Sequence, residues 1–123
     1  MAMEYGRSDR ISSLVRRELA ILITREMQDP RTQHTSVTAV ELSRDKSTAR
    51  VFIITAQSGP EKHTEVVQVL NKAAGFLRKK LGERVHLKRI PKLVFVYDES
   101  IEHGARLSAL IDELSHQSGT DEN

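Results

Sequence analysis

The chain has 123 residues, a length that fits one compact domain and is too short for two. It has no cysteine, which excludes disulfides, thiolate catalysis and cysteine-bound zinc or iron–sulfur sites. No apolar run approaches the roughly 20 residues of a membrane span, and the first ten residues lack the apolar centre of a signal peptide. We therefore expect a soluble cytoplasmic protein that needs no metal or other cofactor and has no membrane partner.

The net charge of +2 hides a strong asymmetry along the chain. Residues 78–92 hold seven basic residues and one acid, a net charge of +6, whereas residues 98–123 hold seven acids and one base, a net charge of −6. A concentrated positive segment attracts polyanions whatever the overall balance. On charge alone, the solvated face of a helix and its loop explains this segment equally well.

The first expected elements are a helix and a β-hairpin. The helix begins after Ser8, a plausible N-cap, and ends before Pro30. Its apolar residues recur at helical spacing: Ile11, Leu14, Val15, Leu19, Leu22, Ile23 and Met27. Residues 37–42 and 49–55 are rich in β-branched side chains and flank the turn-like residues 43–46, which indicates a hairpin. Val37 and Val40 are three apart, so the register of the first strand stays open.

A second helix is expected to begin at residues 58–61, where Ser58 and Glu61 have the spacing of a capping box. Its apolar stripe continues through a run of small residues, at Val66, Val67, Leu70, Ala73, Ala74, Leu77 and Leu81. Gly75 interrupts this helix and indicates either close packing against the sheet or, as we favour, a kink.

The last expected elements are a strand and a helix. Leu93 to Tyr97 has the composition of a strand buried on both faces or nearly so. Asp98, Glu99 and Ser100 begin a helix with an apolar stripe at Leu107, Leu110, Ile111 and Leu114. The order α-β-β-α-kink-α-β-α predicts a single α+β domain with helices on one face of a three-stranded sheet. We expect this domain to span residues 1–116 and the polar residues 117–123 to be a disordered tail.

Catalytic machinery is nearly absent from the sequence. The five histidines are scattered without metal-ligand spacing, and neither a Gly-x-Ser-x-Gly nor a phosphate-loop pattern occurs. Asp98, Glu99 and Glu102 are formal candidates for acid–base work, but helix capping explains them better. We therefore expect no enzymatic activity and no small-molecule substrate.

The basic segment directly follows the small residues Ala73, Ala74 and Gly75. A helix that starts at a kink exposes backbone N–H groups and the positive end of its dipole, which suit phosphate oxygens. The KH module clamps about four single-stranded nucleotides in a comparable way, with a Gly-x-x-Gly loop between two helices. We therefore predict an RNA-binding surface that contains Ala73, Ala74, Gly75, Arg78, Lys79, Lys80, Arg84, Lys88, Arg89, Arg7 and Arg10.

Several short motifs occur between about Arg7 and Leu114 in a specific order and spacing. They are Arg10-Ile11, Arg17-Glu18-Leu19, Asp29-Pro30-Arg31, Val37-Thr38-Ala39-Val40, Ser43-Arg44-Asp45, Ala73-Ala74-Gly75-Phe76-Leu77-Arg78, Pro91-Lys92-Leu93 and Phe95-Val96-Tyr97-Asp98. In these motifs the chain resembles ribosome-binding factor A, a bacterial family of small-subunit assembly and cold-adaptation factors. The resemblance implies a type II KH-like fold in which an Ala-x-Gly kink, here Ala73-Ala74-Gly75, replaces the Gly-x-x-Gly loop.

The same resemblance implies partners. It implies binding to the free or immature 30S subunit, contact with 16S rRNA near its decoding-side neck, and release before translation. It further implies a role in late subunit maturation without catalysis. We expect the protein to act as a monomer.

A second hypothesis is a protein–protein adaptor whose basic segment docks an acidic partner. Salt dependence separates the two hypotheses, because binding to single-stranded RNA follows a log–log slope near −0.7 per phosphate neutralised. Aromatic residues make up only 4% of the chain, which argues against a base-stacking platform of the RRM type. Phe95 and Tyr97 are expected in the core.

Overall fold

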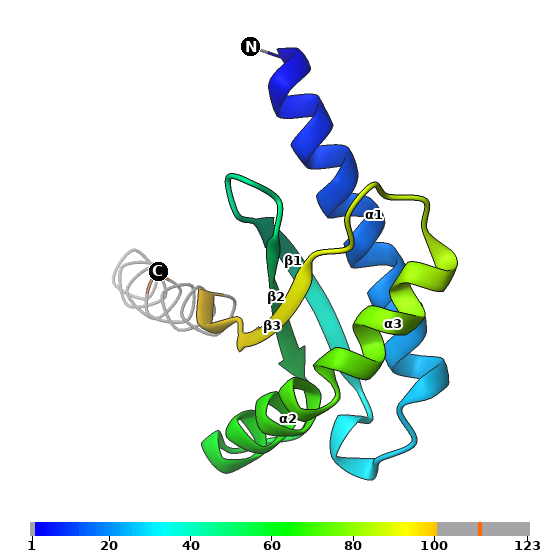
Figure 1. Ribbon diagram of the computed structural model, residues 1–123. Coiled ribbons are helices and arrows are strands. Elements are labelled where there is room, and N and C mark those ends of the chain that lie inside the picture. Colours follow the sequence, from blue (N-terminus) through cyan, green and yellow to red (C-terminus); the bar gives the residue numbers. More distant parts are fainter. Residues whose placement is uncertain (1, 101–110, 112–123) are drawn as a thin grey trace, which may run out of the picture.

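The computed structural model describes the backbone of residues 2–100 and of residue 111, and the side chains of that set from Ser8 onward. In chain order the elements are α1 (Ala2–Glu26), the 3-10 helix η1 (Pro30–Thr32), β1 (Thr35–Leu42), β2 (Thr48–Thr55), α2 (Pro60–Lys72), α3 (Ala74–Arg84) and β3 (Lys92–Tyr97). The three α-helices lie on one face of a three-stranded sheet, and the first turns of α1 extend past it (Figure 1). The predicted α+β architecture is confirmed.

The sheet has the order β1-β2-β3, with β1 antiparallel and β3 parallel to the central strand β2. A parallel pair needs a long crossover connection, which α2 and α3 supply. The pairing of β1 with β2 shifts register between Val37 and Ala39. This β-bulge explains why Val37 and Val40 are three apart and yet both buried.

The hydrophobic core fills the space between the sheet and the helices. Its members come from every main element: Val15, Leu19, Leu22, Ile23, Val37, Val40, Ala49, Val51, Ile53, Val66, Leu70, Leu77, Leu81, Val85, Leu93 and Phe95. Full burial of such a side chain is worth about 1.5–3 kcal/mol. The first two helical stripes predicted from the sequence, that of residues 11–27 and that of residues 66–81, are confirmed, since their remaining members are partly buried against this core.

Two predicted helix caps are wrong, although α2 begins at Pro60, within the predicted residues 58–61. α1 begins at Ala2, so Ser8 lies inside the helix; the residues before it include good helix formers that let the helix continue upstream. At α2 the N-cap is Gly59, with φ 106°, and no side chain caps the helix. Pro60 takes the first helical position, where its fixed φ is favourable, and Ser58 therefore falls one residue too early for a capping box.

The prediction that β3 is buried on nearly both faces is also wrong. Leu93 and Phe95 face the helices and are buried, whereas Val94 and Val96 on the opposite face are only half-buried. In the described part of the chain, helices cover one face of the sheet. The continuous apolar run of β3 therefore belongs to a strand with only one covered face. Phe95 belongs to the core as predicted, and Tyr97 packs against it.

The predicted kink is confirmed, but it lies at Ala73. This residue has φ −90° and ψ 3°, and its N–H donates to the carbonyls of both Val69 and Leu70 at 3.1 Å. An L-residue adopts this bridge conformation without glycine. Gly75 lies inside α3, and a Cβ there would meet nothing within 4 Å. The close-packing interpretation of Gly75 is therefore wrong.

The chain leaves β3 as predicted, at a capping aspartate. The Asp98 carboxylate accepts hydrogen bonds from the backbone and side chain of Ser100 and from the Thr38 hydroxyl. The Ser100 hydroxyl, followed by that of Thr38, lowers the pKa of Asp98. Ile111 is helical and exposed; the rest of the predicted last stripe and residues 117–123 lie outside the described residues. Among those described, no helix combines the length and apolarity needed to cross a bilayer.

Candidate nucleic-acid interface

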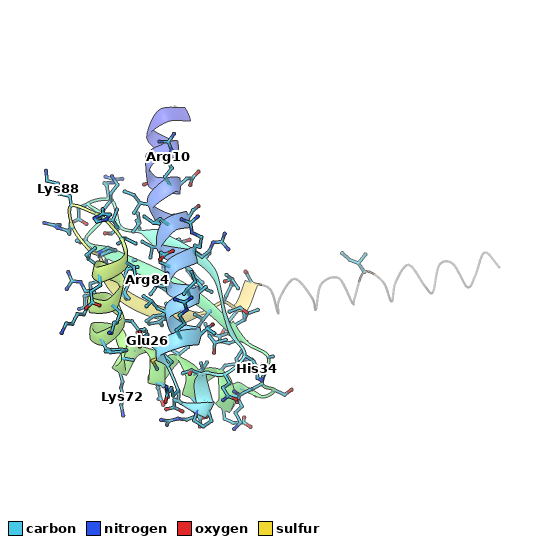
Figure 2. The ribbon with its side chains drawn as sticks, turned by 90° about the vertical axis from the view of Figure 1, so that its right-hand side faces the viewer. Arg10, Glu26, His34, Lys72, Arg84 and Lys88 are labelled. Carbon is cyan, nitrogen blue, oxygen red and sulfur yellow. The ribbon has the colours of Figure 1, made fainter. Side chains whose placement is uncertain are left out.

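α3 orients most of the predicted RNA-binding residues. Its buried residues, Leu77 and Leu81, hold one side against the core, so the opposite side is exposed. The helix has 11 residues and is therefore roughly 16 Å long at about 1.5 Å per residue. Figure 2 shows Lys72 at one end of the molecule, Arg84 near its middle and Lys88 toward the other end. The basic side chains thus follow one helix from the break to the loop beyond it.

The start of α3 has the features expected of a phosphate-binding helix end. No side chain caps it, and the first N–H groups of a helix have no partner within the helix. The helix dipole places partial positive charge there. Ala73 and Ala74 are half-buried and Gly75 is exposed, with open space where its side chain would be. An anion can therefore approach the backbone closely at this point.

Phe76 is a candidate that the sequence analysis missed. It follows Gly75 directly and is 44% exposed, which sets it apart from the other large apolar side chains described between Ser8 and Ser100. The ammonium group of Lys80 lies 5.8 Å from its ring centroid, within reach of a cation–π contact. The sequence feature that could have identified Phe76 is its position outside the apolar stripe of α2 and α3. An exposed ring beside a helix start offers a base a stacking surface.

Arg78 forms hydrogen bonds within the fold. Its guanidinium donates from Nε and Nη2 to the Ile90 carbonyl, at 3.1 and 2.8 Å. This contact ties α3 to the loop between α3 and β3. Of the predicted residues, Arg78 therefore positions the loop that carries Lys88 and Arg89.

Arg84 is also engaged within the fold. Its Nε lies 2.7 Å from the Glu18 carboxylate of α1, whose side chain is only 13% exposed. Figure 2 shows Arg84 between the two helices. Because this pair neutralises a nearly buried acid, reversing Arg84 to glutamate would place two carboxylates together. We therefore expect Arg84→Glu to destabilise the contact between α3 and α1.

Four predicted cations form no ion pair with another described residue. Lys80 has one long ion pair, 3.9 Å to Glu83. By contrast, no ion pair with another described residue occupies the following four side chains: Lys79, Lys88, Arg89 and Arg10. Arg10 and Lys88 lie toward the same end of the molecule (Figure 2). The side chain of Arg7 lies outside the described part, although its backbone belongs to α1.

The described residues offer no cluster of three or more His, Asp or Glu side chains that could hold a metal ion. The acids with lowered pKa values are occupied by hydrogen bonds in turns and caps. Arg31, whose side chain and backbone both donate to Asp29, lowers the pKa of that carboxyl to about 2. The chemistry that the described surface supports is binding of a polyanion.

Solved structures share this fold. The chain matches the crystal structure of ribosome-binding factor A from Thermus thermophilus with a TM-score of 0.66 and 28% identity, over 73% of this chain and 94% of the other. It also matches a homology model of Thermus thermophilus ribosome-binding factor A that was fitted into a cryo-EM map of a complex with the 30S subunit, with a TM-score of 0.60 and 28% identity, over 72% and 91% of the two chains. These neighbours confirm the predicted KH-like fold.

Sequence relatives agree with the structural neighbours. A ribosome-binding factor A from Dechloromonas aromatica is 52% identical over 111 residues, 90% of this chain and 89% of the relative. One from Pseudomonas fluorescens is 49% identical over 113 residues, 91% and 85% of the two chains. The family model of ribosome-binding factor A matches residues 7–111. This chain therefore belongs to the ribosome-binding factor A family.

Proposed function

We propose that this protein binds the free or immature 30S ribosomal subunit, contacts 16S rRNA and promotes late maturation of the subunit without catalysis. The observation that carries the proposal is the open helix start at Gly75, followed by cations that mostly form no ion pair with another described residue, on the fold of a relative whose homology model has been fitted into a map of a 30S complex. We further propose that the protein acts in the cytoplasm as a monomer, with a role in cold adaptation.

The proposed RNA contact has two parts. At the break, the backbone N–H groups around Gly75 bind a phosphate, and the residues Ala73 and Ala74 leave room for the RNA backbone. Farther along, Lys79 and Lys80 of α3 and Lys88 of the loop bind neighbouring phosphates as point charges. Because phosphate contacts carry no sequence information, this surface recognises the shape and charge of the RNA.

Arg78 and Arg84 act indirectly in this proposal. Arg78 holds the α3–β3 loop through the Ile90 carbonyl, and Arg84 holds α3 against α1 through Glu18. Each leaves part of its guanidinium facing solvent, since both residues are exposed. They are therefore positioning residues first and RNA ligands second.

Co-sedimentation tests the proposal. The purified protein is mixed with 30S subunits and with 70S ribosomes and is followed through sucrose gradients. We expect it to travel with 30S particles and to stay at the top of the gradient with 70S ribosomes. Equal recovery with both particles, or with neither, would refute selective binding to the small subunit.

A binding titration against protein-free 16S rRNA separates RNA recognition from the adaptor hypothesis. Contacts to phosphates predict an affinity that falls steeply and linearly on a log–log salt plot. Association with assembled 30S particles together with no measurable affinity for the free RNA would favour an acidic protein partner instead.

A further inference from the structure

The hairpin turn, the α3–β3 loop and α1 enclose a hollow of about 540 Å³. Its apolar floor comes from three elements, through Ile11, Leu42, Leu87 and Pro91, and its rim carries Asp45, Lys46, Lys88 and Arg89. The volume falls in the usual range of about 300–1,000 Å³ for ligand pockets. This hollow lies beyond the C-terminal end of α3, away from the helix break, and only Lys88 and Arg89 of it belong to the surface predicted from the sequence.

Charge in the hollow favours an anion. Lys46, Lys88 and Arg89 form no ion pair with any other described residue. Asp45 is the single acid of the lining. The Ser47 hydroxyl and N–H, and then the Ser43 hydroxyl, lower its pKa to about 2, so it is ionised at neutral pH. The lining therefore carries three positive charges against one negative charge.

Lys46 has a backbone conformation that residues with a side chain rarely adopt. Its φ is 61°, in the left-handed region, where turns normally use glycine or asparagine. The turn itself is closed without the side chain, because the Lys46 N–H donates to the Ser43 carbonyl at 2.9 Å. Nothing in the turn requires lysine, and Lys46 lines the hollow.

From these features, and resting on the RNA binding proposed above, we infer that the hollow binds one unstacked nucleotide of single-stranded RNA. The base lies on the apolar floor of Ile11, Leu42 and Leu87, and its phosphate is bound by Lys46, Lys88 and Arg89. Floor and rim suit this occupant because a nucleotide combines an apolar ring face with a phosphate anion.

Asp45 gives the hollow a preference among bases. Its hydrogen bonds from Ser43 and Ser47 all end on Oδ1. Within the described part of the chain, Oδ2 is thus the oxygen left to accept a hydrogen bond. Carboxylates accept from the amino group of cytosine, which uracil lacks. The hollow therefore binds cytidine more tightly than uridine.

Methyl NMR tests the assignment of the floor. The full chain is titrated with single-stranded hexacytidine, with hexauridine, with an RNA duplex of the same length and with inorganic phosphate. A base stacked on the floor shifts the methyl signals of Ile11, Leu42 and Leu87 through its ring current, and we expect this with hexacytidine most strongly. The same methyl shifts with duplex or with phosphate alone would overturn the inference, and equal affinities for the two hexamers would overturn the role of Asp45.

A pair of glycine variants tests the rim. Lys46→Gly removes the ammonium group and the disfavoured backbone conformation together, so we expect an unchanged or higher melting temperature and a three- to tenfold weaker affinity for hexacytidine. The control is His34→Gly, because His34 is the other non-glycine residue with positive φ, 63°, in the described part of the chain, and it does not line the hollow. An unchanged affinity of Lys46→Gly would overturn the inference.

The outcome for the hollow is separable from that for the proposed function. If the protein co-sediments with 30S subunits but the methyl signals of Ile11, Leu42 and Leu87 do not shift, the proposed function stands and the nucleotide pocket is refuted. A protein that binds neither 30S subunits nor any RNA loses both.

Discussion

Gly75 occupies an exposed position in α3 where a side chain would have open space. Glycine inside a helix lowers stability by about 0.5–1 kcal/mol relative to alanine, and packing does not explain why it stands there. The proposed close approach of the RNA backbone would explain it. Gly75 therefore lowers the stability of α3 at the position where RNA binding is proposed.

Gly75→Ala should raise the free energy of unfolding by about 0.5–1 kcal/mol and weaken binding to 30S subunits, with Gly75→Val weaker still. Denaturant unfolding and co-sedimentation measure the two effects. Gly82→Ala is the control, because Gly82 is also exposed in α3 and its added Cβ would make an ordinary 3.4 Å contact with Ile90. Undiminished binding of both Gly75 variants would show that the RNA backbone stays away from this position.

Asp45 stabilises the hairpin turn in its charged form. Its folded-state pKa of about 2 lies below the ordinary value of 3.8 because serine donors hold the carboxylate. Its contribution is therefore complete above pH 3.8 and is lost as the pH falls toward 2. We expect Asp45→Asn to unfold at a lower temperature than the parent at pH 7, and the gap to close between about pH 4 and pH 2. A gap that is constant across this range would contradict the assignment.

At the scale of elements, the helix break depends on how the end of α2 is attached to the sheet. Asn71, two residues before the break, donates from Nδ2 to the Phe95 carbonyl at 3.0 Å and accepts from the Phe95 N–H at 2.8 Å. Its amide thus takes the place of a neighbouring strand at the edge of β3. This pair of bonds attaches the last turn of α2 to β3 directly before the helix break.

Asn71→Ala should lower the free energy of unfolding by about 1–2 kcal/mol, because it leaves both backbone groups of Phe95 without their partner. It should also weaken 30S binding by misplacing the helix break. Gln68→Ala is the control: Gln68 is exposed on the same helix and makes no side-chain hydrogen bond to another described residue. Equal stability of the two variants in denaturant unfolding would contradict this role of Asn71.

The elements differ in how far the sequence predicted them. Periodicity located the helices and strands because burial on one side imposes it. It missed the exact position of the break, since the conformation of Ala73 is open to any residue and leaves no compositional mark. It also overestimated burial of β3, where Val94 and Val96 suit a strand whether or not a helix covers them.

At the scale of the whole molecule, the segregation of charge along the chain predicted a basic surface but not which cations are free. Arg78 and Arg84 look equivalent to Lys79 in the sequence, and only tertiary contacts with Ile90 and Glu18 distinguish them. Lys46 escaped prediction for the same reason, because the hollow that it lines is assembled from segments far apart in the chain. Local composition does not encode such contacts.

Two charge-neutralised variants test the central claim most directly, which is that the α3 surface binds rRNA phosphates. Lys79→Gln with Lys88→Gln removes two cations of that surface that form no ion pair with another described residue. Arg50→Gln with Lys62→Gln removes two exposed cations from β2 and from the first turns of α2. Both double variants change the net charge equally, from +2 to 0.

The measurement is the affinity for 30S subunits as a function of salt. The first variant should bind more weakly than the parent, with a log–log slope less steep by about 1.4, because each of the two phosphates that is no longer neutralised reduces the slope by about 0.7. The second variant should keep the slope of the parent. Equal slopes for the two variants would contradict the claim, because only overall charge would then matter.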